Sequence, residues 1–324
     1  MGLSAARLSR RGVLGAALVA ATSASAFPDR VVRLIVPTPA GGGTDVAARL
    51  IARELAGELG QSVIVENRVG GNGVIGSSQV AQSPPDGHTL LMAAASVMAL
   101  NPHLIRNLTY DPLSSFSPIA FVGETTVMMA VAPRTPFRSL ADVIEAARKD
   151  PAGLSYATPG FASMPHLMGE IISGAAGVNL VPVPFRGGSE ATTAVMGGQV
   201  DVMIDSLTTV LPLAAEGRVR VIVSGAPARM TQMPDTPVLS ETFPGTEAAG
   251  WFAVFGPAGM PAPVQGELNR RLDLIVRRPA VQERLAGLGL YPVADNTPAA
   301  LAQRVAHDLH RYGEVIRSRN IKSN

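Results

Sequence analysis

The segment from Pro37 to Asp45, Pro-Thr-Pro-Ala-Gly-Gly-Gly-Thr-Asp, combines backbone freedom with polar side chains that could hold an anion. An apolar run from Val31 to Val36 precedes it and predicts a strand, and an amphipathic pattern that begins near Asp45 predicts a helix. Glycines let a ligand approach the backbone, and the first N–H groups of a helix are free to bind a negative charge. The segment therefore predicts an anion cradle. The alternative is a plain strand-to-helix turn in which Asp45 caps the helix.

The order of residues in this segment excludes the common nucleotide motifs. A phosphate-binding loop needs a Lys and a hydroxyl residue after its last glycine, and a dinucleotide fingerprint needs spaced glycines. Here Gly41, Gly42 and Gly43 are consecutive, and Thr44 and Asp45 follow them. A polyphosphate would meet a carboxylate where a cation is expected, so a small organic anion is the predicted ligand.

Three further turns rich in glycine or serine follow a predicted strand and open a predicted helix. They are Gly70–Gly76, Ala157–Ser163 and Arg186–Glu190. In open α/β sheets, ligands bind beyond the carboxyl ends of the strands, where such turns gather. Two lobes that each offer helix starts to a shared cleft would form a binding protein that closes around its ligand.

Short apolar runs alternate with helical patterns through the chain, which favours an α/β architecture with mostly parallel sheets. The predicted strands are Val31–Val36, Val63–Val65, Thr89–Ala93, Ile119–Val122, Val127–Ala132, Val181–Val183, Val202–Ile204 and Val219–Val223. The predicted helices are Asp45–Leu59, Ser139–Lys149, Pro165–Gly174, Ser189–Gly197, Pro263–Arg277 and Pro298 to about Arg317. A chain of 324 residues can bury one large or two medium cores.

Residues 1–26 have the pattern of an export signal. A start with three arginines precedes an apolar stretch from Gly12 to Ala21, and small residues at Ala24–Ala26 predict cleavage before Phe27. The pattern fits the twin-arginine or the general secretory route, and the apolar stretch is too short to span a bilayer. We therefore expect a periplasmic protein that is not embedded in the membrane.

Composition narrows the chemistry further. The chain has no cysteine, so disulfides, thiolate chemistry and lipid attachment at a cysteine are excluded. The formal net charge of +2 becomes about −1 when the three arginines of residues 1–26 are removed, and no basic run supports nucleic-acid binding. His307 and His310 lack a third ligand in register, so we expect neither a metal nor another cofactor.

The order of motifs resembles the periplasmic solute receptors of tripartite tricarboxylate transporters, the Bug-type receptors. The matching stretches include VRLIVPTPAGGGTDVAARLIA, VENRVGGNGVIGSSQVA, LTYDPLSSFSPIA, SYATPGFASMPHLMGE, VPVPFRGGSEATTAVMGGQVDVMID and GWFAVFGPAGMP. The resemblance implies an α/β, two-lobed clamshell of the periplasmic binding protein type (type II-like), with two crossings between the lobes. Lobe 1 would comprise residues 27–126 and 251–324, and lobe 2 residues 127–250. We expect a monomer without enzymatic activity.

The resemblance also implies a carboxylate site that both lobes share. Thr38, Ala40, Gly41, Gly42 and Thr44 would contribute from lobe 1, where Asp45 would cap the helix, bind ordered water or accept from the ligand. Lobe 2 would add the residues Thr158, Gly160, Ser163, Phe185, Arg186 and Asp205. Arg186 would screen ligand charge or lie on the surface, and Asp205 would face the cleft or cap the next helix.

This sequence departs from the family pattern at positions that bear on specificity. Thr38 stands where an aromatic residue is usual, His88 and Phe185 stand where Tyr is common, and Glu190 stands where a small residue or Pro is frequent. Loss of the aromatic removes an apolar wall, and Glu190 adds negative charge near the cleft. A mono- or dicarboxylate is therefore a better expectation than a tricarboxylate, with delivery to a membrane transporter.

Two alternatives remain open from the sequence alone. The loaded receptor could dock on a membrane sensor kinase instead of a transporter, and the sequence does not separate these partners. A serine hydrolase is the enzymatic alternative, because Ser189 follows a strand in an approximate nucleophile elbow, with Asp205 and then His307 or His310 in the required order. The elbow lacks its last glycine, where Ala191 stands, so this alternative is the weaker one.

Overall fold

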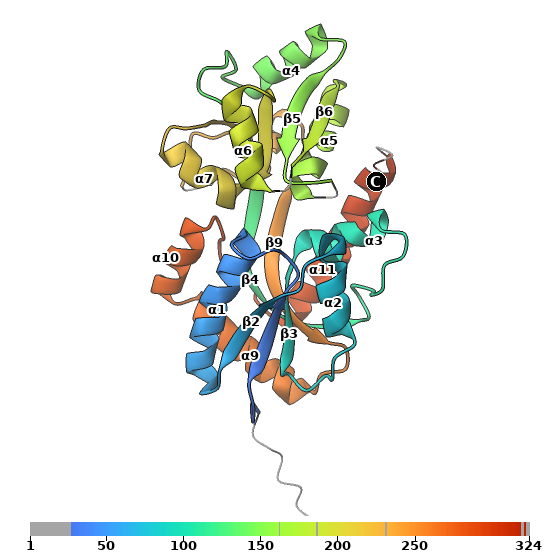
Figure 1. The fold of residues 1–324 in the computed structure, drawn as a ribbon, viewed down its shortest axis with the longest axis vertical. Coiled ribbons are helices and arrows are strands. Elements are labelled where there is room, and N and C mark those ends of the chain that lie inside the picture. Colours follow the sequence, from blue (N-terminus) through green and yellow to red (C-terminus); the bar gives the residue numbers. More distant parts are fainter. Residues whose placement is uncertain (1–26, 162, 186, 231, 319–320, 322–324) are drawn as a thin grey trace, which may run out of the picture.

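The molecule consists of two lobes that are stacked along its long axis and joined by two long strands, β4 and β9 (Figure 1). This computed structural model describes residues 27–161, 163–185, 187–230, 232–318 and 321. The strands of both lobes form one continuous series in the order β2-β1-β3-β9-β4-β7-β5-β6, and β8 pairs with β4. The expected two-lobed clamshell is therefore the observed architecture.

Lobe 1 is a mixed sheet covered by helices on both faces. Its strands are β1 (Val32–Val36), β2 (Val63–Asn67), β3 (Thr89–Ala94), β4 (Phe116–Val131) and β9 (Ala249–Pro257). Its helical segments are α1 (Gly43–Leu59), η1 (Gly71–Gly73), α2 (Val74–Ala81), η2 (Ser96–Leu100), α3 (Asn101–Leu104), α9 (Ala262–Val276), α10 (Pro279–Gly287) and α11 (Pro298–Ser318). Ile51 of α1 and Leu272 of α9 share one apolar cluster, whereas Val80 of α2 and Leu301 of α11 share another. Each helix pair thus covers one face of the sheet.

Lobe 2 repeats this arrangement on a smaller sheet. Its strands are β5 (Leu154–Thr158), β6 (Leu180–Pro184), β7 (Val202–Ser206) and β8 (Arg220–Ser224), and its helices are α4 (Leu140–Lys149), α5 (Met164–Ala176), α6 (Gly188–Gly197), α7 (Leu207–Ala215) and α8 (Leu239–Thr242). Leu167 of α5 packs in a cluster with Val143 of α4, and Ala194 of α6 packs in another with Val210 of α7.

The outer strands of both lobes form parallel pairs, whereas the strands at the hinge form antiparallel pairs. β1 pairs in parallel with β2 and β3, and β5 pairs in parallel with β6 and β7. β4 is antiparallel to β7, β8 and β9, and β9 is antiparallel to β3. The outer strands are connected by helices, which produces the parallel order. The expectation of mostly parallel sheets therefore holds only away from the hinge.

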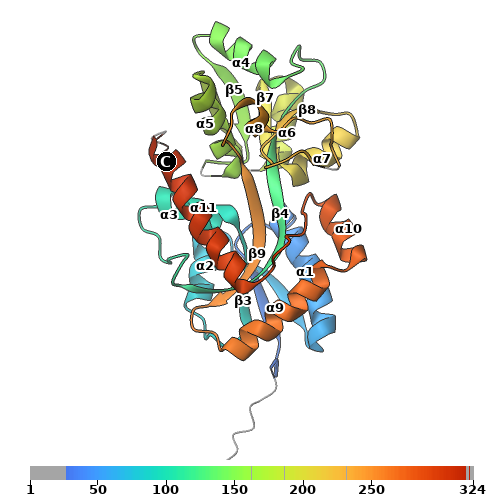
Figure 2. The same cartoon turned by 180° about the vertical axis from the view of Figure 1, so that it is seen from behind.

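A single strand, β4, carries the chain from lobe 1 into lobe 2 (Figure 2). The two separate strands expected at Ile119–Val122 and Val127–Ala132 were wrong in this respect, because Thr125 and Thr126 continue the extended backbone between them. β4 pairs with β9 as far as Thr126 and with β7 from Val127 onward. The chain returns through the segment that enters β9, where the N–H of Ala248 donates to the carbonyl of Gly225 at 2.8 Å. The exact lobe boundaries expected from the sequence stay a prediction.

The C-terminal helix α11 packs along the rear of the molecule, beside the hinge strands (Figure 2). Leu301 near its start packs in lobe 1, whereas Tyr312 and Ile316 near its end belong to the apolar cluster that contains Leu167 of lobe 2. The Tyr312 hydroxyl donates to the carbonyl of Ala249 at 2.6 Å. None of the helices built from the described residues is long and apolar enough to cross a bilayer.

Candidate functional site

A cleft of about 330 Å³ lies between the lobes, beside the two strands that join them. Its volume is at the lower end of the range that is usual for small-molecule sites. The starts of four helices meet there, one from lobe 1 (α1) and three from lobe 2 (α5, α6 and α7). The residues that these helix starts contribute are Gly42, Gly43, Thr44, Ser163, Met164, Pro165, Gly188, Ser206, Thr208 and Thr209. The hinge strands and neighbouring segments contribute Thr38, Ala94, Ala95, Ser96, Thr125, Thr126, Val127, Pro159, Asp205, Gly250, Trp251 and Phe252.

The lobe 1 side of the cleft is the glycine loop that precedes α1. Gly41 has a φ of 82°, which only glycine adopts readily, and Gly42 is the extended N-cap without a side-chain cap. The helix begins at Gly43, two residues earlier than expected. No described side chain caps the first N–H groups of α1, and the positive end of the helix dipole lies at the cleft, which Gly42, Gly43 and Thr44 line. This arrangement suits a bound anion.

Asp45 braces this loop from behind. Its Oδ2 accepts hydrogen bonds from the N–H of Gly41 and from Nε of Arg49, each at 2.9 Å, and its Oδ1 accepts from Nδ2 of Asn67 at 2.9 Å. Burial alone would raise the pKa of Asp45, but these hydrogen bonds hold it below the usual value. The same Asn67 amide donates to the carbonyl of Thr38 at 3.0 Å. Asp45 therefore neither serves as the N-cap nor lines the cleft.

Ser163 prepares the lobe 2 side at the start of α5. Its hydroxyl accepts from the N–H of His166 at 3.3 Å, so it caps the helix, and it donates to the carbonyl of Gly160 at 2.7 Å. Thr158 lies 3.2 Å from the Ser163 hydroxyl. His166 is buried and its ring stacks edge-on against Phe161, and this burial lowers the pKa of His166. These contacts fix the turn that places Pro159 and Ser163 in the lining of the cleft.

Asp205 is the one acidic side chain among the described residues of the cleft. It is the penultimate residue of β7 and is only 2% exposed. Its Oδ1 accepts from the N–H of Ser206 at 2.6 Å, whereas its Oδ2 is buried without a hydrogen-bond partner. Burial raises the pKa of Asp205 to about 6, against a smaller opposing effect of the hydrogen bonds from Ser206. Ser206, not Asp205, occupies the N-cap of α7.

The described lining of the cleft suits an anion although it contains no cationic side chain. None of the described residues that line it is Lys, Arg or His, and its polar groups are mainly hydroxyls, as in Thr38, Thr44 and Ser96. The buried hydroxyl of Thr38 has no hydrogen-bond partner. Trp251 and Phe252 contribute on the hinge side. Helix dipoles, hydroxyls and apolar surface together fit a small organic anion with a short carbon skeleton.

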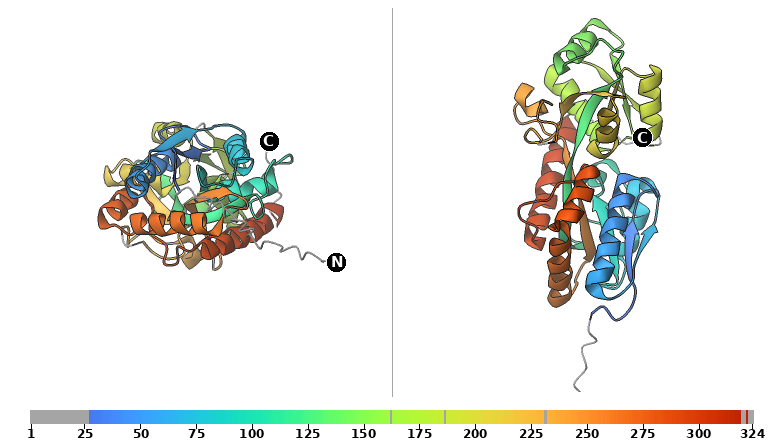
Figure 3. Two further views of the ribbon diagram at one scale, coloured as in Figure 1. Left: turned by 90° about the horizontal axis from the view of Figure 1, so that it is seen from below. Right: turned by 90° about the vertical axis from the view of Figure 1, so that its left-hand side faces the viewer.

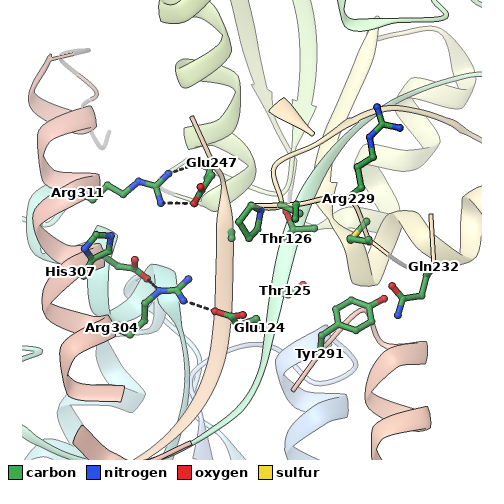
Figure 4. Close-up of a pocket in the computed structure, with 16 residues that line it drawn as sticks. Glu124, Thr125, Thr126, Arg229, Gln232, Glu247, Tyr291, Arg304, His307 and Arg311 are labelled. Carbon is green, nitrogen blue, oxygen red and sulfur yellow. Dashed lines mark hydrogen bonds and ion pairs between the residues drawn. The ribbon is translucent and has the colours of Figure 1, made fainter. Parts of the chain in front are cut away.

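A second and larger cavity, of about 490 Å³, lies on the other side of the hinge strands (Figure 4). In the right-hand view of Figure 3, the blue N-terminal elements lie on one side of these strands and the C-terminal helices on the other. The rear cavity is lined by α11, β4 and residues 226–230. Arg304 contacts Glu124 and Asp308, and Arg311 contacts Glu247. The remaining arginine of the described lining, Arg229, is paired with Glu241 outside the cavity. The rear cavity therefore has no free charge of one sign to offer, and we assign the site to the smaller cleft.

The structure brings five of the predicted site residues into the cleft lining: Thr38, Gly42, Thr44, Ser163 and Asp205. Ala40, Gly41 and Gly160 belong to the two loops that shape it, Asp45 of α1 and Thr158 of β5 hold these loops, and Phe185 packs in the apolar cluster around α6 and α7. Arg186 lies outside the described residues. Direct contact of each of these residues with a ligand stays a prediction.

Several lining residues escaped the sequence analysis. Ser206, Thr208 and Thr209 open α7, and Thr125 and Thr126 lie in the hinge strand. The sequence does contain a signal for Ser206, Thr208 and Thr209, because a short polar segment follows the predicted strand Val202–Ile204. The glycine turns follow their predicted strands in the same way. The threonine pair gave no such signal, since its position at the hinge depends on pairing with distant β9.

The structure does not bring together the residues of the serine hydrolase alternative. Asp205 lines the cleft, whereas His307 lines the rear cavity on the other side of the hinge strands. His310 is exposed and contacts Glu314 on the same helix at 3.3 Å. Ser189 therefore has neither candidate histidine as a general base. Among the described residues, no group of three His, Cys, Asp or Glu side chains could hold a metal ion.

A known protein family matches most of the chain. The family described as "Tripartite tricarboxylate transporter family receptor" matches residues 47–321. The chain belongs to this receptor family. The receptor is also 32% identical to the protein BugT of Bordetella pertussis over 309 residues, which cover 95% of this chain and 94% of BugT. These matches confirm the resemblance to Bug-type receptors.

Solved structures of similar proteins share the receptor's fold. A Rhodopseudomonas palustris protein, Rpa4515 with adipate, superposes with a TM-score of 0.85 at 31% identity, covering 91% of this chain and 99% of that one. MatC from the same species, with bound malate, gives 0.80 at 32% identity, covering 90% and 100%. The two-lobed binding-protein fold predicted from the sequence is thus confirmed.

Proposed function

We propose that this receptor captures a small mono- or dicarboxylate in the cleft between its lobes. The observation that carries the proposal is the convergence of the starts of α1, α5, α6 and α7 on one cleft. Each helix start directs the positive end of its dipole toward the cleft, and the first turns of α1, α6 and α7 lack the side-chain cap that Ser163 gives to α5. The adipate and malate bound to the two similar receptors support a carboxylate as the ligand class.

The size and charge of the cleft favour a ligand with one or two carboxylate groups over a ligand with three. A volume of about 330 Å³ suits a short carbon chain, and the described lining includes Asp205 but no cation. Each additional negative charge on the ligand adds repulsion from Asp205 at short range. A tricarboxylate is therefore the less favoured substrate.

The partner and compartment follow from other features. Residues 1–26 have the pattern of an export signal, which supports a periplasmic protein released by cleavage before Phe27. The family description supports delivery of the bound acid to a tripartite membrane transporter. In cells, loss of uptake of the labelled acid after deletion of the receptor gene tests this role. Normal uptake together with loss of a transcriptional response to the acid would favour a sensor partner.

Binding itself is tested with the purified chain from Phe27 onward. Thermal shift and calorimetry are run against mono-, di- and tricarboxylates, sugars and amines, because a ligand that binds only the native state raises the melting temperature. We expect a response to a mono- or dicarboxylate. The proposal would be excluded if no carboxylate raised the melting temperature or gave a binding signal in calorimetry while a sugar or a cation did.

A Gly42→Val variant tests the glycine loop. A Cβ at Gly42 meets only the carbonyl of Pro39, at 3.5 Å, so the fold tolerates it apart from an N-cap cost of about 1 kcal/mol or less. The added side chain enters the cleft, which Gly42 lines. We expect loss of carboxylate binding with a nearly unchanged melting temperature of the empty protein.

A further inference from the structure

Asp205 has a buried carboxyl group whose second oxygen has no partner, inside a cleft that is otherwise built to attract an anion. Its Oδ1 is fixed by the N–H of Ser206 at 2.6 Å and lies 3.2 Å from the Ser206 hydroxyl. Its Oδ2 is so close to α6 that a Cβ on Gly188 would lie 2.7 Å away. The oxygen without a partner therefore lies between the starts of α6 and α7, where ligand donors also converge.

No described cation neutralises this carboxyl group. The hinge segment Val127–Val131, which pairs with β7, carries no charged residue, and neither do β5 or α7. Helix α5, which packs against β7, carries Glu170 and the buried His166, and burial lowers the pKa of this histidine. On α6 the only charged residue is Glu190, which is exposed. Asp201 at the far end of β7 is bonded to Ser155, and Arg220 of β8 donates to the carbonyl of Phe137. Burial thus acts on Asp205 without a compensating ion pair from the part of the chain that the structure describes, and it raises the pKa of Asp205 to about 6.

We propose that Asp205 takes up a proton when the cleft binds its carboxylate, so that the ligand enters together with one proton from solvent. This inference rests on the proposed function. Two negative charges in one closed cleft repel each other strongly, and such a pair is relieved when one of them binds a proton. The protonated carboxyl group can then donate from Oδ2 to an oxygen of the ligand, which satisfies the atom that lacks a partner. Asp205 thereby becomes a specificity-determining residue that the anion itself converts from acceptor to donor.

A measurable pH dependence follows. Above the pKa of Asp205 in the empty cleft, each rise of one pH unit makes the required proton about tenfold scarcer, so affinity falls by up to about tenfold. Below that pKa the group is already protonated and the affinity becomes independent of pH. The opposite dependence is expected if an ionised Asp205 accepts a hydrogen bond from a ligand hydroxyl or ammonium group.

The test is isothermal titration calorimetry with adipate and with malate between pH 7.0 and 8.5, where both acids are fully ionised. Titrations in phosphate and in Tris, which differ in ionisation enthalpy, give the number of protons taken up per ligand bound. We expect close to one proton and an affinity that falls by roughly tenfold per pH unit. Asp205→Asn keeps the shape and a donor but cannot titrate, so it should bind with neither proton uptake nor pH dependence. Glu216→Gln, which removes an exposed charge after α7, should retain the wild-type slope.

The outcomes separate this inference from the proposed function. Binding of either acid without proton uptake, or with affinity that rises with pH, overturns the proton-coupled role and leaves the carboxylate receptor intact. Failure of every carboxylate to bind contradicts the receptor function and the inference with it. The proton count of the wild-type protein decides the question even if Asp205→Asn does not fold.

Discussion

Trp251 on β9 donates its indole N–H to the Asp308 carboxylate on α11 at 2.8 Å. Both side chains are almost fully buried, and 57 residues separate them in the chain. Trp251 lines the cleft between the lobes, whereas Asp308 lines the rear cavity. This hydrogen bond therefore ties the strand that returns to lobe 1 to the helix that packs behind both lobes.

Replacement of Asp308 by Asn should destabilise the protein by about 1–3 kcal/mol, because Trp251 and Arg304 share its Oδ2 as acceptor. Arg304 donates at 2.9 Å from four residues earlier on the same helix and loses a charged partner in the variant. Denaturant unfolding at pH 7 measures the change in the free energy of unfolding.

The chain offers a matched control on α9. Arg277 and Asp273 are also four residues apart, with 2.8 Å between Nε and Oδ1, but both are substantially exposed. Asp273→Asn should cost less than about 1 kcal/mol, because exposed ion pairs contribute little. Equal losses for the two variants would show that the buried Trp251 contact adds nothing.

The brace formed by Asp45 should give the glycine loop a pH-dependent stability. Asp45→Asn turns one of its two acceptor oxygens into an amide that faces donors, which should cost about 1–3 kcal/mol at pH 7. Because the folded-state pKa of Asp45 lies below the unfolded value, its contribution is complete above about pH 4. It disappears as the pH falls through the folded-state pKa.

Unfolding at pH 7, 5 and 3 checks this sign. The stability difference between wild type and Asp45→Asn should be constant from pH 7 to 5 and smaller at pH 3. Asp235→Asn, at an exposed carboxylate, should change stability little at any of these pH values. A difference that persists undiminished at pH 3 would mean that the charge of Asp45 is not what holds the loop.

Local patterns in the sequence predicted much of the fold, because the relevant interactions are close in the chain. The glycine loop before α1 was predicted from the apolar run Val31–Val36 and the helical spacing that follows it. The continuous strand β4 was not predicted, since Thr125 and Thr126 become part of a strand only through pairing with β9, more than a hundred residues later. The role of Asp45 in α1 was also ambiguous from the sequence, because its hydrogen-bond partner Asn67 lies in β2 and is not close to it in the chain.

Two adjacent glycines at the start of α6 should differ sharply in their tolerance of a methyl group. A Cβ at Gly188 would lie 2.7 Å from Oδ2 of Asp205 and 2.8 Å from Cγ2 of Thr209, whereas a Cβ at Gly187 meets nothing within 4 Å. Gly187 has a φ of 164°, which is extended backbone open to any residue. Gly188→Ala should therefore lower the melting temperature and weaken carboxylate binding, and Gly187→Ala should leave the melting temperature nearly unchanged. Similar thermal shifts for both variants would contradict the close packing of α6 against Asp205.

Contact between the lobes at the mouth of the cleft should depend on the absence of a side chain at Gly43. A Cβ there would lie 3.2 Å from the hydroxyl of Thr208, which belongs to the opposite lobe. Gly43→Ala should hold the start of α7 slightly away from α1 and reduce carboxylate affinity by about tenfold, which corresponds to 1.4 kcal/mol. The stability of the empty protein should not fall, because alanine favours the helix. Gly57→Ala, an exposed position in the same helix with open space around it, gives the helix the same benefit without touching lobe 2. Thermal melts should give the two variants similar stabilities, whereas calorimetry should give Gly43→Ala the lower carboxylate affinity. Equal affinities would show that closure does not bring Gly43 and Thr208 together.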